Sequence, residues 1–243
     1  MKIVAIIEAR MTSSRLPGKV LMEVLGKPIL HYLVERLKQV SLIDEIVLAT
    51  TTNSSDNSLI QFAVNEGIQS YRGSEDDVLT RVIEAAESVE TDLVVEITGD
   101  CPIIDPVIIE QTIRMHLNNN TDYTSNAHIR SYPDGMDVQV YSLNVLRKSS
   151  KMTSKRQDRE HVTLHIRDNP EVFTHTNLIA PSNLYWPKLG LTLDEASDFE
   201  LLKRIIEHFN SKNPLFSCYD VVNFLKKNPE LVLINELVVR KES

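Results

Sequence analysis

The amino-acid sequence predicts an α/β fold in which a mostly parallel sheet carries helices on both faces. Short apolar runs rich in β-branched residues stand at 2–8, 46–50 and 93–97, and such runs are typical of strands buried on both sides. Segments with apolar residues at helical spacing follow these runs, which favours a parallel sheet with crossover helices. The length of 243 residues fits one large domain.

Four helices are expected in the first half of the chain, over 28–40, 56–66, 76–89 and 106–117. In the first of them the apolar residues recur three and four positions apart, and Pro28 suits a first helical turn. Asp56 and Asp105 are expected to cap the second and fourth helices. The third begins with two acidic residues, which favourably oppose the helix dipole.

The second half of the chain is less regular. Residues 118–132 are polar, 133–135 predict a turn, and the alternation at 137–141 predicts a half-exposed strand. Helical spacing returns from about residue 197. The segment 147–167 holds seven basic residues, which either form a solvated face or collect an anionic substrate.

Composition and charge exclude several classes of protein. The chain has 34 acidic and 26 basic residues and a net charge of −8, which argues against broad nucleic-acid binding. Two cysteines cannot form a disulfide framework or a four-ligand zinc site. No run approaches the ~18 apolar residues of a membrane span, and the first expected strand follows Met1 directly. We therefore expect a cytoplasmic enzyme that binds neither nucleic acid nor membrane.

The loop after the first expected strand, residues 9–19, is the first candidate site. It contains three hydroxyl side chains, two arginines, one lysine and one glycine, and it is longer than a simple connection needs. Hydroxyls, backbone N–H groups and cations are what a nucleoside triphosphate requires. The pattern matches neither the dinucleotide-binding glycine motif nor the P-loop. The alternative is a solvated loop whose arginines pair with surface acids.

The loop after the strand at 93–97 is the second candidate site. Asp100 follows Gly99 at the end of this strand, where a carboxylate is well placed to hold Mg²⁺ against phosphates. The alternative is that Asp100 only caps a turn before Pro102. Cys101 has no evident histidine partner, and an adjacent carboxylate raises a thiol pKa, so a nucleophilic role is disfavoured.

A third candidate is the segment 191–198, which contains Asp194, Glu195 and Asp198. From spacing alone, these acids are expected to begin the helix that follows, with Asp198 as a cap.

The motifs at these loops resemble a known family. The run ARMTSSRLPGKVL at 9–21 resembles the nucleotide-binding signature of cytidylyltransferases that activate acidic sugars, and the branch named for the spore coat polysaccharide biosynthesis protein SpsF is the most similar. Supporting motifs follow in the family's order: GKPIL at 26–30, YRGSEDDVL at 71–79, TGDCPIID at 98–105, DGMDVQV at 134–140, REHVT at 159–163 and LTLDEASD at 191–198. The resemblance implies a Rossmann-like sheet of the nucleotide-diphospho-sugar transferase type.

The resemblance also implies a role for each matching residue. Asp100 and Asp194 would be the magnesium carboxylates, which reverses the capping interpretation of Asp194, and Arg15, Lys19 and Asp100 would be catalytic. The implied nucleotide-binding residues are Ala9, Arg10, Ser13, Arg15, Lys19, Arg72, Ser74 and Asp77. Glu160 and His161 would approach the sugar. This sequence departs from the 3-deoxy-manno-octulosonate branch at Thr98, where that branch has glutamine, and at Cys101, where it usually has an acid.

The implied reaction joins CTP and a sugar acid to give a CMP-sugar and pyrophosphate, for surface or coat polysaccharide biosynthesis. Within a single domain over 1–243, residues 1–117 would form the nucleotide-binding half, 118–190 an irregular substrate and dimerisation subregion, and 191–243 the metal aspartate and C-terminal helices. A homodimer is implied. The alternatives are a nucleotide-sugar-dependent glycosyltransferase, although an Asp-x-Asp motif is missing at Asp100, and a catalytically silent nucleotide-binding subunit.

Overall fold

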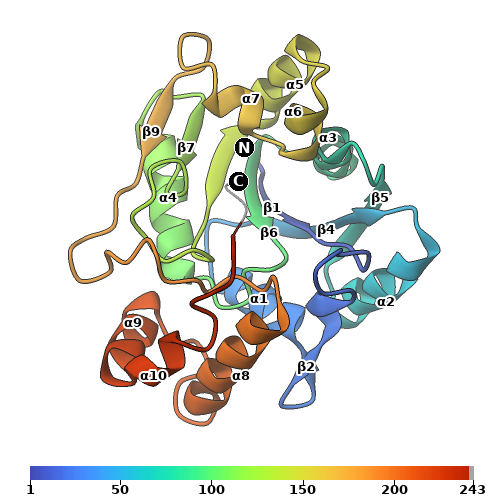
Figure 1. The fold of residues 1–243 in the computed structure, drawn as a ribbon. Coiled ribbons are helices and arrows are strands. Elements are labelled where there is room, and N and C mark those ends of the chain that lie inside the picture. The colour runs from blue at the N-terminus through green and yellow to red at the C-terminus, as the bar shows by residue number, and fades with distance from the viewer. Residues whose placement is uncertain (241–243) are drawn as a thin grey trace.

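The computed structural model describes residues 1–240, which are organised around a seven-stranded sheet (Figure 1). Its strand order is β5-β4-β1-β6-β8-β7-β9, and every strand except β8 runs in the same direction. The strands are β1 Ile3–Glu8, β4 Glu45–Thr51, β5 Gln69–Gly73, β6 Leu93–Thr98, β7 Tyr123–Ser125, β8 Gln139–Ser142 and β9 His175–Asn177. The prediction of a mostly parallel sheet is confirmed.

Helices cover both faces of the sheet, and the sheet separates two hydrophobic cores. Alternation along β1 shows why: Ile3, Ala5 and Ile7 enter one core, while Val4 and Ile6 enter the other. The first core is closed by α1 Ile29–Leu37, α2 Asn57–Glu66, α4 Pro106–Asn118, α8 Ala196–Asn210 and α9 Cys218–Lys227. The second is closed by α3 Val78–Ser88, α5 Leu143–Met152 and α7 Leu164–Arg167, with α6 Arg156–Glu160 against α3.

Several short elements have no counterpart in the sequence-based expectations. They are the hairpin of β2 Glu23–Val24 and β3 Lys27–Pro28, the strands β5, β7 and β9, the helices α5, α6 and α7, and 3₁₀ turns at Lys19–Leu21 and Ser54–Asp56. The short α10 Pro229–Val232 lies within the C-terminal stretch that was expected to be helical. Strands of three to five residues give little periodicity, so their pairing depends on neighbours in the fold.

The expectation of a half-exposed strand at 137–141 is wrong. The strand is β8, which lies between β6 and β7 in the middle of the sheet, with Val140 and Tyr141 fully buried. Val140 enters the first core and Tyr141 the second, so both faces of β8 are covered at its centre, while Gln139 and Ser142 at its ends are half-buried. The polar residues that suggested exposure belong instead to the rim of a cavity.

The expected helix caps have mixed outcomes. Asp105 caps α4 by accepting a hydrogen bond from the Val107 amide, as predicted. The third helix begins at Val78, later than expected, because Asp77 caps it through the Thr80 amide. The prediction that Asp56 caps α2 is wrong, since its side chain makes no cap hydrogen bond and instead serves the loop after β1.

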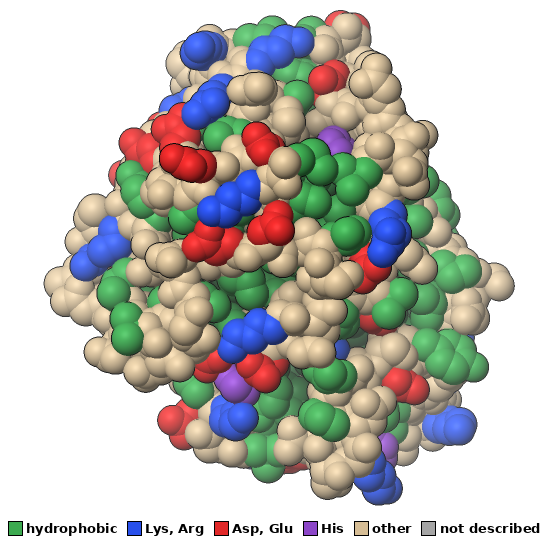
Figure 2. Space-filling model, turned by 180° about the vertical axis from the view of Figure 1, so that it is seen from behind, with side chains coloured by type: hydrophobic (Ala, Val, Ile, Leu, Met, Phe, Trp, Pro, Cys, Tyr) green, Lys and Arg blue, Asp and Glu red, His purple; other side chains and the backbone are tan. Residues whose placement is uncertain are grey.

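The surface mixes charges of both signs. Seen from behind, acidic and basic side chains are interspersed among apolar ones, and no broad basic tract covers that face (Figure 2). Within residues 1–240, no helix combines the length and the apolar character needed to cross a membrane.

The parallel strands bring their following loops to one edge of the sheet. β1, β4, β5 and β6 pair in parallel register, so the loops that follow Glu8, Thr51, Gly73 and Thr98 emerge side by side. In open α/β sheets, ligands bind at this edge. The two loops singled out from the sequence, 9–19 and 98–102, therefore lie next to each other.

Candidate active site

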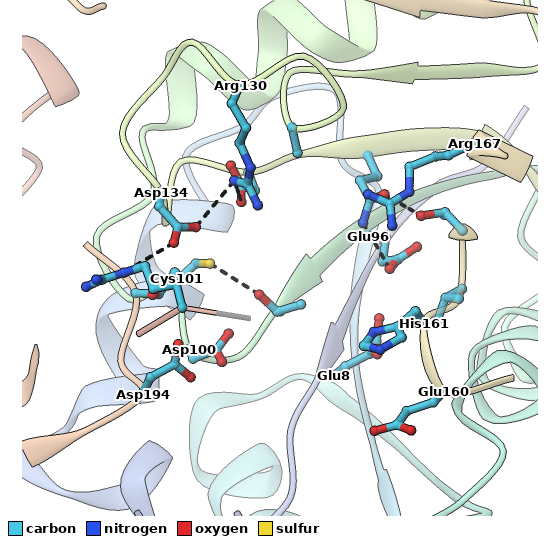
Figure 3. A pocket seen from close by; sticks show the side chains of 18 of the residues that line it. Glu8, Glu96, Asp100, Cys101, Arg130, Asp134, Glu160, His161, Arg167 and Asp194 are labelled. Atoms are coloured by element: carbon cyan, nitrogen blue, oxygen red, sulfur yellow. Dashed lines mark hydrogen bonds and ion pairs between the residues drawn. The ribbon is translucent and has the colours of Figure 1, made fainter. Parts of the chain in front are cut away.

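A cavity of about 260 Å³ opens at this edge of the sheet (Figure 3). Its lining is dominated by charged side chains from segments distant in the sequence. They are Glu8, Arg15, Glu96, Asp100, Arg130, Asp134, Asp137, Glu160, His161, Arg167, Asp194 and Arg240. In Figure 3, Asp100 and Asp194 lie on one side of the cavity, and Glu8, Glu96, Glu160 and His161 lie on the other. The cavity thus has two chemically distinct ends.

Lys19 joins two carboxylates at the first end. Its ammonium lies 3.0 Å from Asp100 Oδ2 and 3.1 Å from Asp194 Oδ1, and it also donates to the Leu193 carbonyl. Burial alone would lower the pKa of Lys19, but the carboxylates of Asp100 and Asp194 together raise it above its ordinary value. Lys19 therefore stays protonated, and three of the predicted site residues converge at one point.

Backbone contacts fix the two carboxylates relative to each other. The Leu193 amide donates to the Asp100 carbonyl at 2.8 Å, which ties the loop after β6 to the segment before α8. Gly99 allows the loop after β6 to approach β1, because a Cβ at this position would lie 2.9 Å from both Ala9 Cβ and the Glu8 carbonyl oxygen. The capping interpretation of Asp198 is confirmed: it accepts from the amides of Asp194 and Glu195 at the start of α8.

The loop 9–19 is folded against the end of β4. Asp56, which is fully buried, accepts hydrogen bonds from the Met11 amide at 2.8 Å and from the Thr50 hydroxyl at 2.9 Å. Burial opposes ionisation of this carboxyl, but these bonds and those from Thr51 lower the pKa of Asp56 below its usual value. The loop closes with Gly18, whose φ of 72° suits glycine and whose amide donates to the Met11 carbonyl.

Two arginines of this loop point in different directions. Arg15 forms an ion pair with Asp194, at 2.6 Å from Oδ1, and lines the cavity. Arg10 pairs with Glu75 at 3.2 Å, so it leans toward the loop after β5. Ala9 is buried at the base of the loop, and Ser13 is half-buried within it.

Arg72, Ser74 and Asp77 lie beside the loop 9–19 but make structural contacts in this structure. Arg72 binds the carbonyls of Thr51 and Asn53, and the Ser74 hydroxyl accepts from the Asp77 amide. Asp77 caps α3 and pairs with Arg159 at 2.6 Å. Despite the cost of burial, Arg159 and the α3 N-terminus lower the pKa of Asp77. The predicted role of Arg72, Ser74 and Asp77 in nucleotide binding stays a prediction.

A pair of glutamates forms the floor of the second end. Glu8 ends the apolar run of β1, and Glu96 interrupts the apolar run of β6. The Glu96 carboxylate accepts hydrogen bonds from the Tyr141 hydroxyl and, at 3.2 Å, from the side-chain amide of Gln139. Burial, reinforced by the nearby Glu96 carboxylate, raises the pKa of Glu8 well above its usual range. Burial also raises the pKa of Glu96. The pair therefore holds a proton more readily than exposed glutamates do.

A second acidic pair lies in the loop before β8. Arg130 contacts Asp137 at 2.8 Å and Asp134 at 3.4 Å. Burial raises the pKa of Asp137 to about 6, because the attraction of Arg130 compensates only in part. Burial likewise raises the pKa of Asp134. Asp134 and Asp137 belong to the DGMDVQV motif, for which the sequence predicted no functional role.

Glu160 and His161 reach the cavity from the end of α6, and Arg167 reaches it from α7, where it lies next to Glu96 (Figure 3). Of the seven basic residues in 147–167, Arg167 is the one that lines the cavity among the described residues. Arg147 pairs instead with Glu87, and Arg159 with Asp77. The basic stretch thus contributes Arg167 to the cavity, while Arg147 and Arg159 form ion pairs with acidic residues in and before α3.

Cys101 lies in the cavity wall but is fully buried, and the Thr98 hydroxyl contacts its sulfur at 3.2 Å. Burial, together with the Asp100 carboxylate, raises the pKa of the Cys101 thiol well above its usual range. The thiol is therefore protonated, in agreement with the argument against a nucleophilic role.

The first end of the cavity suits a divalent cation bound by oxygen. Asp100 and Asp194 already share one cation, the Lys19 ammonium, and their side chains remain 27% and 12% exposed. Magnesium typically takes one or two protein carboxylates and keeps several waters, and a partly open carboxylate pair meets that need. These residues fit the group that the sequence predicted for them.

Sequence reasoning missed much of the cavity wall. Glu8 and Glu96 carried a usable signal, because a charged residue within an apolar strand is costly unless it serves a site. Arg240 carried none, since it lies in a segment remote from every motif.

Comparisons with known proteins agree with this geometry. A family model described as cytidylyltransferase matches residues 4–231. The spore coat polysaccharide biosynthesis protein SpsF of Bacillus subtilis is 33% identical over 94% of this chain and 95% of its own length. The 3-deoxy-manno-octulosonate cytidylyltransferase of Geobacter metallireducens is 33% identical over 46% of this chain and 44% of its own length. A structure of a cytidylyltransferase from Leptospira borgpetersenii superposes with a TM-score of 0.91, 30% identity and 99% coverage of both chains.

Proposed function

Since this chain belongs to the cytidylyltransferase family, we propose that it transfers the CMP group of CTP to a sugar acid and releases pyrophosphate, in a magnesium-dependent reaction. Membership in this family makes the chain a cytidylyltransferase rather than a glycosyltransferase or a silent nucleotide-binding subunit. The sugar-acid substrate, the magnesium ion and a role in polysaccharide synthesis are our proposals.

One observation carries the proposal: Lys19, Arg15, Asp100 and Asp194 form a single charged cluster at the carboxyl edge of the sheet. A triphosphate needs cations for its phosphates and a carboxylate pair for its accompanying metal ion. This cluster supplies both within one end of one cavity.

The reaction needs positioning and charge neutralisation more than covalent chemistry. The acceptor hydroxyl attacks the α-phosphorus and gives up its proton to solvent as the new P–O bond forms. The bond between the α-phosphorus and the oxygen that bridges to the β-phosphorus breaks, and pyrophosphate leaves with the electron pair. Arg15 and Lys19, which both contact Asp194, would bind the phosphates and offset the negative charge that develops on the leaving group. Asp100 and Asp194 would hold magnesium, which neutralises phosphate charge when bound.

The second end of the cavity supports a polar acceptor. Glu8, Glu160 and His161 offer acceptors and donors for sugar hydroxyls, and Arg167 supplies a cation at the same end. A cation beside hydroxyl-binding groups is what a sugar carboxylate needs for recognition. The names of the similar SpsF and 3-deoxy-manno-octulosonate proteins support a polysaccharide sugar acid as acceptor.

Pyrophosphate release in the presence of Mg²⁺ tests this proposal. Four nucleoside triphosphates are combined with eight- and nine-carbon sugar acids and with the corresponding neutral sugars. We expect release that requires both CTP and a sugar acid. Equal release with a neutral sugar would refute the proposed acceptor class, and release with another triphosphate in place of CTP would refute the proposed donor.

A further inference from the structure

The C-terminal segment 235–240, here called the tail segment, contributes to the cavity wall. Figure 1 shows the red end of the chain leaving α9 and α10 and running up to the sheet beside β6. At its end, Arg240 lines the cavity together with Asp134 and Asp194. None of the motifs recognised in the sequence includes this segment.

Polar contacts, not apolar packing, hold the tail segment in place. The side chains of Leu237 and Val239 are 92% and 82% exposed, whereas Asn235 is buried. Asn235 donates to the Gly190 carbonyl at 3.0 Å and to Asp198 Oδ1 at 2.7 Å. Because these apolar side chains face solvent and Asn235 is buried, hydrogen bonds place the tail segment.

Arg240 occupies a slot made by Gly190. A Cβ added at Gly190 would lie 1.8 Å from Arg240 Nη2 and 1.9 Å from Cζ, which no atom tolerates. From this slot, Arg240 donates to Asp198 at 2.7 Å and pairs with Asp134 at 3.3 Å. Gly190 does not have a positive φ, so the feature that a side chain at this position would change is the space that Arg240 occupies.

The buried carboxylate of Asp198 links Arg240 to the proposed metal site. Its Oδ1 accepts from Asn235 and Arg240, while its Oδ2 accepts from the backbone amides of Asp194 at 3.0 Å and Glu195 at 2.9 Å. The same side chain therefore fixes the tail segment on one oxygen and the Asp194 backbone on the other. The tail segment also reaches the loop 9–19, because Arg15 donates to the Val239 carbonyl at 3.3 Å.

We propose that Arg240 is a positioning residue of the active site: through Asp198 it holds the backbone of Asp194, and through Gly190 the tail segment is seated in the cavity wall. The metal-binding consequence rests on the proposed function. Groups that orient metal ligands typically contribute about 10–100-fold to metal affinity or activity. The tail segment is then part of the site and not a peripheral extension.

Manganese binding to the full chain, measured by electron paramagnetic resonance, tests the proposal together with hydrogen exchange of the Asp194 and Glu195 amides. We expect Arg240→Ala to weaken Mn²⁺ binding about 10-fold and to speed the exchange of both amides. Arg240→Lys should restore part of both effects, because it keeps the charge. Arg204→Ala, which removes an exposed arginine from the outer side of α8, is the matched control.

Gly190→Ala separates the seating of Arg240 from general disruption. Because its methyl group would displace Arg240, the single variant should reproduce Arg240→Ala, and the double variant should be no worse than Arg240→Ala alone. Additive losses, or unchanged amide exchange and Mn²⁺ affinity in Arg240→Ala, would overturn the proposal. If the natural chain binds no Mn²⁺ and releases no pyrophosphate, the proposed function fails, and the exchange rates of the two amides alone decide the role of Arg240.

Discussion

Replacing Lys19 by methionine should lower turnover and strengthen metal binding in the absence of nucleotide. The Lys19 ammonium lies 3.0 Å from Asp100 and 3.1 Å from Asp194, between the carboxylates that we assign to the metal ion. Hydrogen bonds to charged groups contribute about 1.5–3 kcal/mol each, so these two stabilise the carboxylate pair by about 3–6 kcal/mol. An incoming cation competes with this ammonium for the two carboxylates.

The two effects have opposite signs, which makes the prediction specific. If a bound metal ion regains only about 1.4 kcal/mol of the interaction energy that the carboxylates lose with the ammonium, the affinity of the nucleotide-free Lys19→Met variant for Mn²⁺ rises about 10-fold. Turnover should fall at least ~100-fold, or about 2.7 kcal/mol, because the triphosphate loses a charge-assisted contact.

Mn²⁺ titration without nucleotide and pyrophosphate release with CTP measure the two effects. Lys38→Met, which removes a lysine that pairs with Glu35 at the surface, is the matched control and should change neither. Circular dichroism establishes that the variants are folded. A Lys19→Met variant that binds Mn²⁺ no more tightly than the natural chain, or that keeps its turnover, would refute this interpretation of the cluster.

Three further substitutions test other parts of the account. Asp100→Asn should lower kcat at least ~100-fold in the pyrophosphate assay in a variant that is still folded by circular dichroism, and unchanged kcat would remove Asp100 from the site. Asp56→Ala should lower the free energy of unfolding by about 3 kcal/mol at pH 7, because buried donors including the Met11 amide lose their acceptor; a loss below 1 kcal/mol in urea unfolding would contradict this. For Asp137, whose pKa is about 6 in the folded chain and about 3.9 unfolded, the folded state binds the proton more tightly. Its stabilising contribution is therefore complete below about pH 4 and is lost as the pH rises to 6, so Asp137→Asn should gain stability relative to the natural chain between pH 4 and 7; a constant difference in urea unfolding would contradict this.

The N-terminal half of the fold could be predicted because its signals are local. The run at 2–8 has apolar residues on both faces of a strand, and β1 is the strand in which those faces enter two cores. Asp105 could be predicted as a cap because capping depends on the next few residues alone. By contrast, β8 looked half-exposed, since its central position in the sheet depends on contacts with β6 and β7.

The candidate site was predictable in part for a similar reason. Lys19, Asp100 and Asp194 belong to recognisable motifs, and the parallel sheet brings their loops together. Asp56 was misassigned because its partners, Met11 among them, lie across a loop–loop contact that local spacing does not record. Arg240 was missed because its place depends on a slot at a distant glycine, which only the folded chain reveals.

The fate of the nucleotide tests the central claim most directly. The chain is incubated with Mg²⁺, a sugar acid and CTP labelled in the α-phosphate, and the products are separated by chromatography and identified by mass spectrometry. We predict that the label enters a CMP ester of the sugar acid, with one pyrophosphate formed per ester, and that Asp100→Asn forms both at least ~100-fold more slowly. Label recovered as free CMP, or a labelled product that forms without the sugar acid, would contradict the account.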